Sequence, residues 1–326
     1  MAWKKLYILG AGSYGKIYYA VKIDSYGLCA SVAAVKCADI RRSISLQLEA
    51  QILTTLKGCP YVVQFFGANV NIDDGTYNLF LEYACGGSLH DLIINSKKGM
   101  IKMSELEVGF YAYQLLKGIQ HVHKKGWIHC DIKPANILVF DNASECNMHK
   151  LKLADFGLSL KVGNGMRHPT RTPSSNRGTL LYAPPESLTY GFHGKAYDIW
   201  SLGCTVAEMM TGTHVWIYHD ATDLQCKIRN ENPVIPSNVS EIARDFLYKC
   251  FIKDPRRRWT SKQLLKHPFI QQALCNYSMP ETQGQTTRVN SFCCQISVPE
   301  KDFINSLVET SLRIRNKIAK AFIGCC

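Results

Sequence analysis

The chain has 326 residues, of which 46% are apolar, and it carries a formal net charge of +12. This length and composition suffice for a substantial core, and no apolar run approaches the roughly 20 residues of a membrane-spanning helix. The N-terminus, Met1–Lys5, lacks the apolar stretch of a signal peptide, so we expect a cytoplasmic protein with access to the nucleus. The basic residues form no stripe interleaved with aromatic side chains, so we expect no nucleic-acid partner.

The fourteen cysteines are dispersed and include no Cys-x-x-Cys pair. A zinc site or a disulfide framework is therefore not expected. The simplest interpretation is reduced, mostly buried thiols that serve as small apolar side chains.

The first predicted element is a glycine-rich hairpin. The string Gly10-Ala11-Gly12-Ser13-Tyr14-Gly15 separates two runs that favour strands, Tyr7–Leu9 and Ile17–Val21. The same glycine spacing opens dinucleotide-binding units, but a helix follows it there, whereas β-branched and aromatic residues continue here. Because glycines permit close backbone approach, this pattern predicts a hairpin folded over phosphate groups.

A lysine and a glutamate downstream are expected to pair. The strand-like run Ser31–Lys36 ends in a lysine whose burial would be costly without a partner. Apolar spacing in Ser45–Leu53 fits a helix packed on a sheet, and Glu49 within it is the expected partner. For Glu49 alone, a solvated surface position is the competing interpretation.

The pattern changes from strands to helices near Tyr83. Ala84–Ser88 is predicted to be a flexible connection, and Ser104–Glu107 a capping box that opens a long helix through Ile119. Further helices are predicted over 196–211, 238–251 and 260–266. We expect a two-lobed α+β fold with a strand-rich lobe over 3–83, a helical lobe over 84–270 and a tail over 271–326.

The most informative segment is Ile128-His129-Cys130-Asp131-Ile132-Lys133-Pro134-Ala135-Asn136, which Asp155-Phe156-Gly157 follows. Two apolar runs, 137–140 and 151–154, predict short strands that hold Asp131, Asn136 and Asp155 close together. Carboxylate and amide oxygens of this kind coordinate Mg²⁺. An isolated His-x-Asp would indicate a surface turn, but the following lysine and asparagine make the pattern specific.

These motifs resemble the catalytic loop and metal-binding motif of eukaryotic protein kinases, and the resemblance extends from Trp3 to Phe269. Pro184-Pro185-Glu186 stands where the family usually has Ala-Pro-Glu. Arg258 stands where an arginine pairs with that glutamate, and Asp198 where an aspartate supports the catalytic-loop backbone.

The loop lysine, Lys133, and the later Thr179 are similar to those of serine/threonine kinases rather than tyrosine kinases. The resemblance implies that Thr179 closes on the catalytic aspartate, which is Asp131 here. Runs such as Asn78–Ala84 and Asp198–Val206 are similar to plant mitogen-activated protein kinase kinase kinases of the MEKK-like class.

The resemblance implies ATP and Mg²⁺ as cofactors and a mitogen-activated protein kinase kinase as protein substrate. It implies that Asp131 orients the substrate hydroxyl and accepts its proton, that Lys133 neutralises charge on the γ-phosphoryl group, and that Asn136 and Asp155 hold metal. Nucleotide is expected in a cleft between the lobes, behind a gatekeeper at Leu81. The implied nucleotide-binding residues are Leu9, Gly10, Gly12, Ser13, Gly15, Ile17, Lys36, Glu49, Glu82 and Ala84.

Two alternatives stay open. A pseudokinase scaffold would usually have lost Lys36, Asp131, Asn136 or Asp155, and all four are present. Membership of another serine/threonine kinase group is the second. A nucleic-acid-binding module would rest on net charge alone.

Cys130 occupies a position where many kinases carry an arginine that binds a phosphorylated activation loop. We therefore expect basal activity to depend weakly on phosphate at the loop hydroxyls, which are Thr170, Thr172, Ser174, Ser175 and Thr179. The alternative is a clamp formed by Arg171 or Arg177.

The tail ends in a basic amphipathic segment, 312–322, followed by Cys325 and Cys326. Contact with an anionic membrane is one interpretation. A tail without a membrane role is the favoured one.

Overall fold

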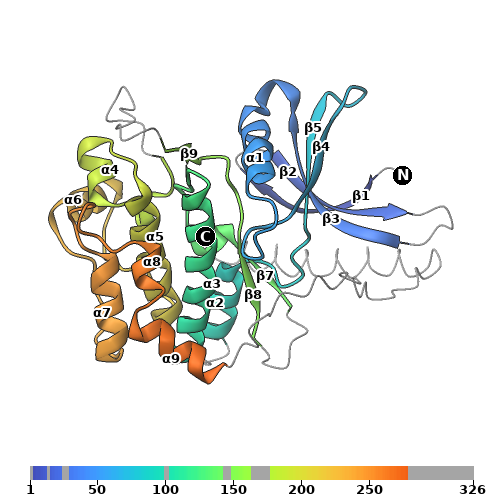
Figure 1. Ribbon diagram of the computed structural model, residues 1–326. Coiled ribbons are helices and arrows are strands. Elements are labelled where there is room, and N and C mark those ends of the chain that lie inside the picture. The colour runs from blue at the N-terminus through green and yellow to red at the C-terminus, as the bar shows by residue number, and fades with distance from the viewer. Residues whose placement is uncertain are drawn as a thin grey trace, which may run out of the picture.

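A computed structural model of the protein describes residues 3–12, 15–23, 29–98, 103–141, 148–162 and 177–277. These residues form a sheet-rich lobe followed by a mainly helical lobe, as Figure 1 shows. The predicted two-lobed α+β class is confirmed. Within the described part, no helix is both long and apolar enough to cross a membrane. Several residues discussed above lie outside the described ones: Ser13, Thr170, Arg171, Thr172, Ser174, Ser175, Cys325 and Cys326.

The N-terminal lobe is a five-stranded antiparallel sheet in the order β1-β2-β3-β5-β4. Its strands are β1 (Trp3–Gly12), β2 (Gly15–Ile23), β3 (Cys29–Asp39), β4 (Phe65–Asn71) and β5 (Thr76–Leu81). After a short turn, η1 (Ile40–Arg42), helix α1 (Ile44–Thr55) packs on one face of the sheet through buried Leu46, Ile52 and Leu53. The predicted strand ending at Lys36 and the predicted helix containing Glu49 lie within β3 and α1.

The second lobe is built from helices around α3. Its helices are α2 (Leu89–Lys98), α3 (Glu105–Lys124), α4 (Pro185–Tyr190), α5 (Lys195–Thr211), α6 (Ala221–Asn230), α7 (Glu241–Cys250), α8 (Ser261–Leu264) and α9 (Pro268–Asn276). Two short ladders complete it: β6 (Trp127–Ile128) pairs with β9 (Leu160–Lys161), and β7 (Ile137–Phe140) pairs with β8 (Lys150–Leu153). Single 3-10 turns are η2 (Pro134–Asn136) and η3 (Leu180–Tyr182).

Side-chain caps begin several of these helices. Ser104 accepts the Glu107 N–H at 3.2 Å at the start of α3, and Thr260 forms a capping box with Gln263 at the start of α8. The predicted start of α7 at Asn238 is wrong, because Ser240 is the residue that caps this helix and accepts the Ala243 N–H. The sequence favoured Asn238 because Glu241 follows it at the spacing of a capping box.

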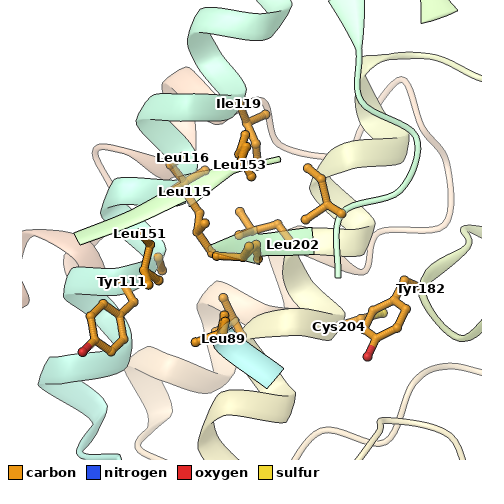
Figure 2. Packing of buried hydrophobic residues seen from close by; sticks show 14 of the residues in the cluster. Leu89, Tyr111, Leu115, Leu116, Ile119, Leu151, Leu153, Tyr182, Leu202 and Cys204 are labelled. Carbon is orange, nitrogen blue, oxygen red and sulfur yellow. The ribbon is translucent and has the colours of Figure 1, made fainter. Parts of the chain in front are cut away.

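The core lies where α3 passes between β8 and α5. Figure 2 shows side chains of α3, among them Leu115, Leu116 and Ile119, converging with Leu151 and Leu153 of β8 and Leu202 of α5. Gly118 permits this approach, since a Cβ there would lie 2.9 Å from the Tyr61 carbonyl oxygen and 3.0 Å from a Leu153 methyl carbon. This packing fixes β8, which pairs with β7, the strand that follows the polar loop 129–136.

The cysteines are less buried than predicted. All nine that the structure describes are free thiols. Cys59, Cys130, Cys204 and Cys250 are buried, whereas three others, Cys85, Cys226 and Cys275, are exposed. Cysteine was assigned to the core as a residue type, and the type alone does not say which face of an element a side chain occupies.

A buried ion pair joins α4 to the segment that precedes α8. Arg258 donates from both terminal nitrogens to Glu186, at 2.7 and 2.9 Å, and also to the backbone carbonyls of Ala196 and Ile252. The two side chains are 0% and 4% exposed. The predicted pairing of Arg258 with Glu186 is therefore present.

Substituting Glu186→Ala should lower the free energy of unfolding by about 3–5 kcal/mol, because it leaves the Arg258 charge buried without its partner. Chemical denaturation followed by circular dichroism measures this. The control is Arg256→Ala, whose side chain is 90% exposed and which should change stability little. Equal, small losses in the two variants would contradict the assigned role.

Candidate active site

Lys36 joins three elements of the molecule. Its ammonium nitrogen, on β3, lies 2.8 and 2.9 Å from the two carboxylate oxygens of Glu49 on α1. It also lies 3.1 Å from Oδ1 of Asp155, which follows β8 in the second lobe. The predicted pairing of Lys36 with Glu49 is present, and Asp155 is a further partner that ties the two lobes together.

The charges in this cluster set one another's protonation. Burial disfavours the charged form of Lys36, but attraction by Glu49 and Asp155 more than offsets it, so the pKa of Lys36 is raised. Burial likewise opposes ionisation of Asp155, yet the neighbouring Lys36 ammonium holds the pKa of that carboxyl below its usual value. For Glu49, burial is the larger effect and raises the pKa, against the attraction of Lys36.

Glu49 also fixes the start of the Asp155-Phe156-Gly157 motif. The Phe156 N–H donates to Oε1 of Glu49 at 3.3 Å, and the Phe156 ring lies 4.6 Å, centroid to centroid, from the imidazole of His129. Asp155 has φ 64°, a left-handed conformation that costs a non-glycine residue about 1–3 kcal/mol. These contacts offset that cost and hold the Asp155 carboxylate against Lys36.

The glycine-rich hairpin is formed by β1 and β2. Gly12 pairs with Gly15, and Gly10 with Ile17, while a register irregularity falls at Leu9. Gly15 has φ 134°, and a Cβ there would lie 2.1 Å from the Cys37 carbonyl oxygen, so the packing of β2 on β3 requires glycine. A Cβ at Gly10 would meet no described atom within 4 Å, which leaves its backbone open to close approach by a ligand.

Asp131 is held by four donors. Its Oδ1 accepts the Thr179 N–H at 3.0 Å and the Thr179 hydroxyl at 2.8 Å. Its Oδ2 accepts the Asn136 amide at 2.7 Å and lies 3.0 Å from the Lys133 ammonium. Lys133 donates in turn to the Thr179 hydroxyl at 2.7 Å. The structure thus brings Asp131, Lys133 and Asn136 into one cluster, and the predicted closure of Thr179 on Asp131 is present.

A second buried carboxylate, Asp198 on α5, supports the loop backbone. It accepts the N–H groups of His129 and Cys130, each at 2.9 Å, and His123 Nε2 lies 2.8 Å from it. Cys130 has φ 66°, another left-handed residue, and these two hydrogen bonds stabilise it. The role of Asp198 was predicted, whereas His123 was missed, because a histidine within an amphipathic helix gives no specific pattern.

The imidazole of His129 links the loop to the metal-binding motif. Nε2 lies 3.0 Å from the Ala154 carbonyl oxygen, and Nδ1 accepts the Asp131 N–H at 3.3 Å, which places the proton on Nε2. His129 therefore bridges the residue before Asp155 and the backbone of Asp131.

The donor atoms fit a magnesium ion. Asn136 uses its NH₂ group to donate to both Asp131 O and Asp131 Oδ2, which leaves its amide oxygen as the ligand atom. The Ala154 N–H donates to the Asn136 carbonyl at 3.0 Å, so the residue before Asp155 is tied to Asn136. Within the described residues, no three His, Cys, Asp or Glu gather into a metal site. One amide oxygen and one carboxylate suit Mg²⁺, which completes its shell with phosphate oxygens and water.

Glu82 and Ala84, which follow β5, are among the implied nucleotide-binding residues. The Glu82 N–H donates to Gln64 O at 2.9 Å and the Ala84 carbonyl accepts from Gly87, whereas no hydrogen bond to described residues uses Glu82 O or Ala84 N. Leu81, the predicted gatekeeper, is 3% exposed. The free carbonyl and N–H are therefore the backbone groups left for a ligand.

The side chain of Glu82 has a partner that the sequence analysis missed. Lys152 of β8 lies 2.5 and 2.6 Å from its carboxylate oxygens, and the Lys152 ammonium sits 4.4 Å from the centre of the Phe140 ring. The alternation Lys150-Leu151-Lys152-Leu153 indicates two exposed lysines, yet Lys152 is only 6% exposed. This pair anchors the connection between the lobes.

Cys130 contains no group that could bind phosphate. Its side chain is buried with Ile128, Ala183 and Tyr197, and burial, followed by the charge of Asp198, raises the pKa of the thiol well above its usual range. The positive charge of the partly buried Arg177 acts in the opposite direction on that thiol. Arg177 is thus the described residue on which the alternative clamp rests.

A comparison with known proteins agrees with this site geometry. The protein kinase domain matches residues 3–270, so the chain belongs to the protein kinase family. Such domains use ATP, usually with Mg²⁺.

Its relatives include serine/threonine kinases of one signalling class. Mitogen-activated protein kinase kinase kinase 20 of Arabidopsis thaliana is 36% identical over 277 residues, which cover 83% of this chain and 78% of that protein. Mitogen-activated protein kinase kinase kinase 18 of the same plant is 37% identical over 283 residues, with the same coverage of 83% and 78%. Mitogen-activated protein kinase kinase kinase A of Dictyostelium discoideum is 34% identical over 301 residues, 87% of this chain and 29% of that protein. The predicted resemblance is confirmed.

Treatment of the purified protein with phosphatase should leave its rate of phosphate transfer nearly unchanged, because a buried thiol at position 130 cannot anchor a loop phosphate. The measurement is an initial rate with radiolabelled ATP before and after treatment. A large fall in rate would contradict the expectation. The same assay on Arg177→Gln then shows whether that guanidinium forms the clamp, since its loss would remove the sensitivity to phosphatase.

Proposed function

We propose that this kinase is a mitogen-activated protein kinase kinase kinase, which transfers the γ-phosphate of ATP to serine or threonine hydroxyls of a mitogen-activated protein kinase kinase. The names of the Arabidopsis relatives support this cascade role, since the similarity spans 78% of their length. A cytoplasmic location with access to the nucleus suits such a role.

The observation that carries the catalytic part of the proposal is the geometry around Asp131. A carboxylate held by Asn136 and Lys133 from one side and by Thr179 from the other has a fixed orientation, which a proton acceptor for a substrate hydroxyl requires. Asp131 orients the hydroxyl and accepts its proton. Lys133, 3.0 Å away, neutralises negative charge on the transferred group.

The nucleotide would be bound by groups from both lobes. The backbone of the hairpin at Gly10, Gly12 and Gly15 would cover the phosphates, as Ser13, which lies outside the described residues, is also expected to do. Lys36, positioned by Glu49, would bind the α- and β-phosphates. The base lies against Leu9 and Ile17 and hydrogen-bonds to the backbone of Glu82 and Ala84. Mg²⁺, when held by Asn136 and Asp155, supplies positive charge that balances the phosphates.

We infer a kinase domain over residues 3–270, with lobes over 3–83 and 84–270, and a tail over 271–326. Helix α9 crosses the last boundary and buries Ala273 in the core, and Tyr277 after it also packs on the core, so the packed part of the chain continues to Tyr277. For the tail we favour no membrane role.

The competing function is a scaffold that keeps the fold without turnover. Its usual sign would be a missing Lys36, Asp131, Asn136 or Asp155, and here all four are present and joined by polar contacts. Membership of a different serine/threonine kinase group is the other alternative, and the choice of substrate separates it.

The test is phosphate incorporation from Mg-ATP into a panel of purified mitogen-activated protein kinase kinases, with wild type and Asp131→Asn in parallel. The amide keeps the size of the side chain but cannot accept a proton, so incorporation should fall by about 100-fold or more. The matched control is Asp73→Asn, in the exposed turn between β4 and β5, which should behave as wild type.

Equal rates for wild type and Asp131→Asn would overturn the catalytic assignment. Incorporation into a general protein substrate but into no mitogen-activated protein kinase kinase would retain a kinase and overturn the cascade role.

A further inference from the structure

A groove on the helical lobe lies apart from the residues that surround Asp131. It encloses about 670 Å³ and is formed by the end of α3, the segment from Phe192 into α5, and the segment from Pro255 into α8. Helices α3, α5 and α8 lie beside one another in the helical lobe of Figure 1, and α3 contacts both of the others. We call this cavity the basic groove.

Four cationic side chains with solvent access line the basic groove: Lys124, Lys195, Arg256 and Lys262. No aspartate or glutamate is among its lining residues. Among the described residues, Lys124, Lys195 and Lys262 form no ion pair, whereas Arg256 lies 3.3 Å from the neighbouring Asp254. Like charges gathered without counter-charges repel one another, and an anionic ligand would relieve that repulsion.

The interior of the basic groove is apolar. Phe192 and Trp259 are partly exposed within it, and Ile199 closes it from α5. A hollow of this kind accepts a bulky apolar side chain while the surrounding lysines bind carboxylates. A flat anionic membrane could reach the lysines but could not fill the hollow.

The walls of the basic groove are preformed. Arg258 is fixed by its two hydrogen bonds to Glu186, and His123 is held 2.8 Å from Asp198. Both of these lining residues direct their polar groups to partners inside the protein, so they hold the walls in place rather than bind a ligand. A site that does not need to be ordered on binding loses less entropy when it is occupied.

The net charge of the chain disfavours its own segments as occupant, although residues 300–309 are locally acidic, with three carboxylates against one lysine. Residues 278–326 contain six lysines or arginines against four aspartates or glutamates, and residues 163–176 contain no acidic residue. A second copy of the chain would bring another net charge of +12 to the contact. Charge complementarity therefore favours an acidic segment of a different protein as the ligand.

We propose that the basic groove binds an acidic peptide segment of a partner protein, with carboxylates on Lys124, Lys195 and Lys262 and one large apolar side chain in the hollow beside Phe192. Binding in the groove requires no phosphate transfer, so its test is independent of the cascade role proposed above.

The probe is a short fluorescein-labelled peptide of glutamates with two central leucines, titrated with the full-length protein and followed by fluorescence anisotropy. Two companion peptides replace the glutamates by lysines or the leucines by serines. The glutamate-leucine peptide should bind, the lysine peptide should not, and the serine peptide should bind more weakly. Added salt should weaken the binding, because the pairs are partly exposed.

The variant Lys124→Glu/Lys195→Glu/Lys262→Glu should weaken binding by at least about tenfold, since it turns attraction into repulsion. The matched control is Lys4→Glu/Lys57→Glu/Lys266→Glu, which changes net charge equally at exposed lysines outside the groove and should bind as wild type. Circular dichroism checks the fold of each protein. If the first variant does not fold, Lys124→Gln/Lys195→Gln/Lys262→Gln replaces it, again with weaker binding expected.

The substitution Phe192→Ala tests the hollow separately. It should weaken the binding of the glutamate-leucine peptide and leave the affinity for the serine peptide unchanged, because only the glutamate-leucine peptide places an apolar side chain in the hollow. Equal affinity of the groove and control variants would overturn the proposal. So would binding to phosphatidylserine vesicles without binding to any acidic peptide.

Discussion

The cation of Lys36, shared between Glu49 and Asp155, is the interaction on which the rest of the site depends. It connects the sheet, the helix packed on that sheet and the segment that follows β8, and so couples the two lobes through one ammonium group. Because Glu49 is 0% exposed, its carboxylate has lost the stabilisation of water, and Lys36 together with the Phe156 N–H replaces part of it. The position of α1 and the orientation of Asp155 therefore depend on the same ion pairs.

Asp198 performs the corresponding task inside the helical lobe. The carboxylates of Glu49 and Asp198 each hold a polar segment whose backbone conformation is unfavourable by itself. Asp155 has φ 64° and Cys130 has φ 66°. Such strain persists only where surrounding hydrogen bonds determine the conformation, and it is concentrated at functional sites. The two strained residues flank the His129 imidazole, which bonds to the Asp131 N–H and the Ala154 carbonyl, so loop and metal-binding motif are aligned through one ring. This alignment explains how side chains more than twenty residues apart in sequence form one cluster.

The sequence predicted the contacts whose residues belong to motifs, such as Lys36 with Glu49, Thr179 with Asp131 and Arg258 with Glu186. It could not predict the ion pair of Lys152 with Glu82. Strand alternation places Lys152 on the exposed face, and no local pattern indicates that the Phe140 ring and a carboxylate contact it. The start of α7 failed for a similar reason, since asparagine and serine both cap well, and the hydrogen bonds of Ser240 to the distant Glu105 carboxylate cannot be predicted locally. The basic groove could not be predicted because its lysines come from three separate segments, and the sequence does not show which charged residues lie close together in space.

The most direct test of the central claim is phosphate transfer by Lys36→Met and Asp155→Ala, measured with radiolabelled ATP beside circular dichroism of each variant. Both substitutions remove charge between the lobes without opening the core, so each should abolish transfer while the spectrum stays that of wild type. Turnover at the wild-type rate in either correctly folded variant would contradict this role, because the site would then function without the ion pairs of Lys36.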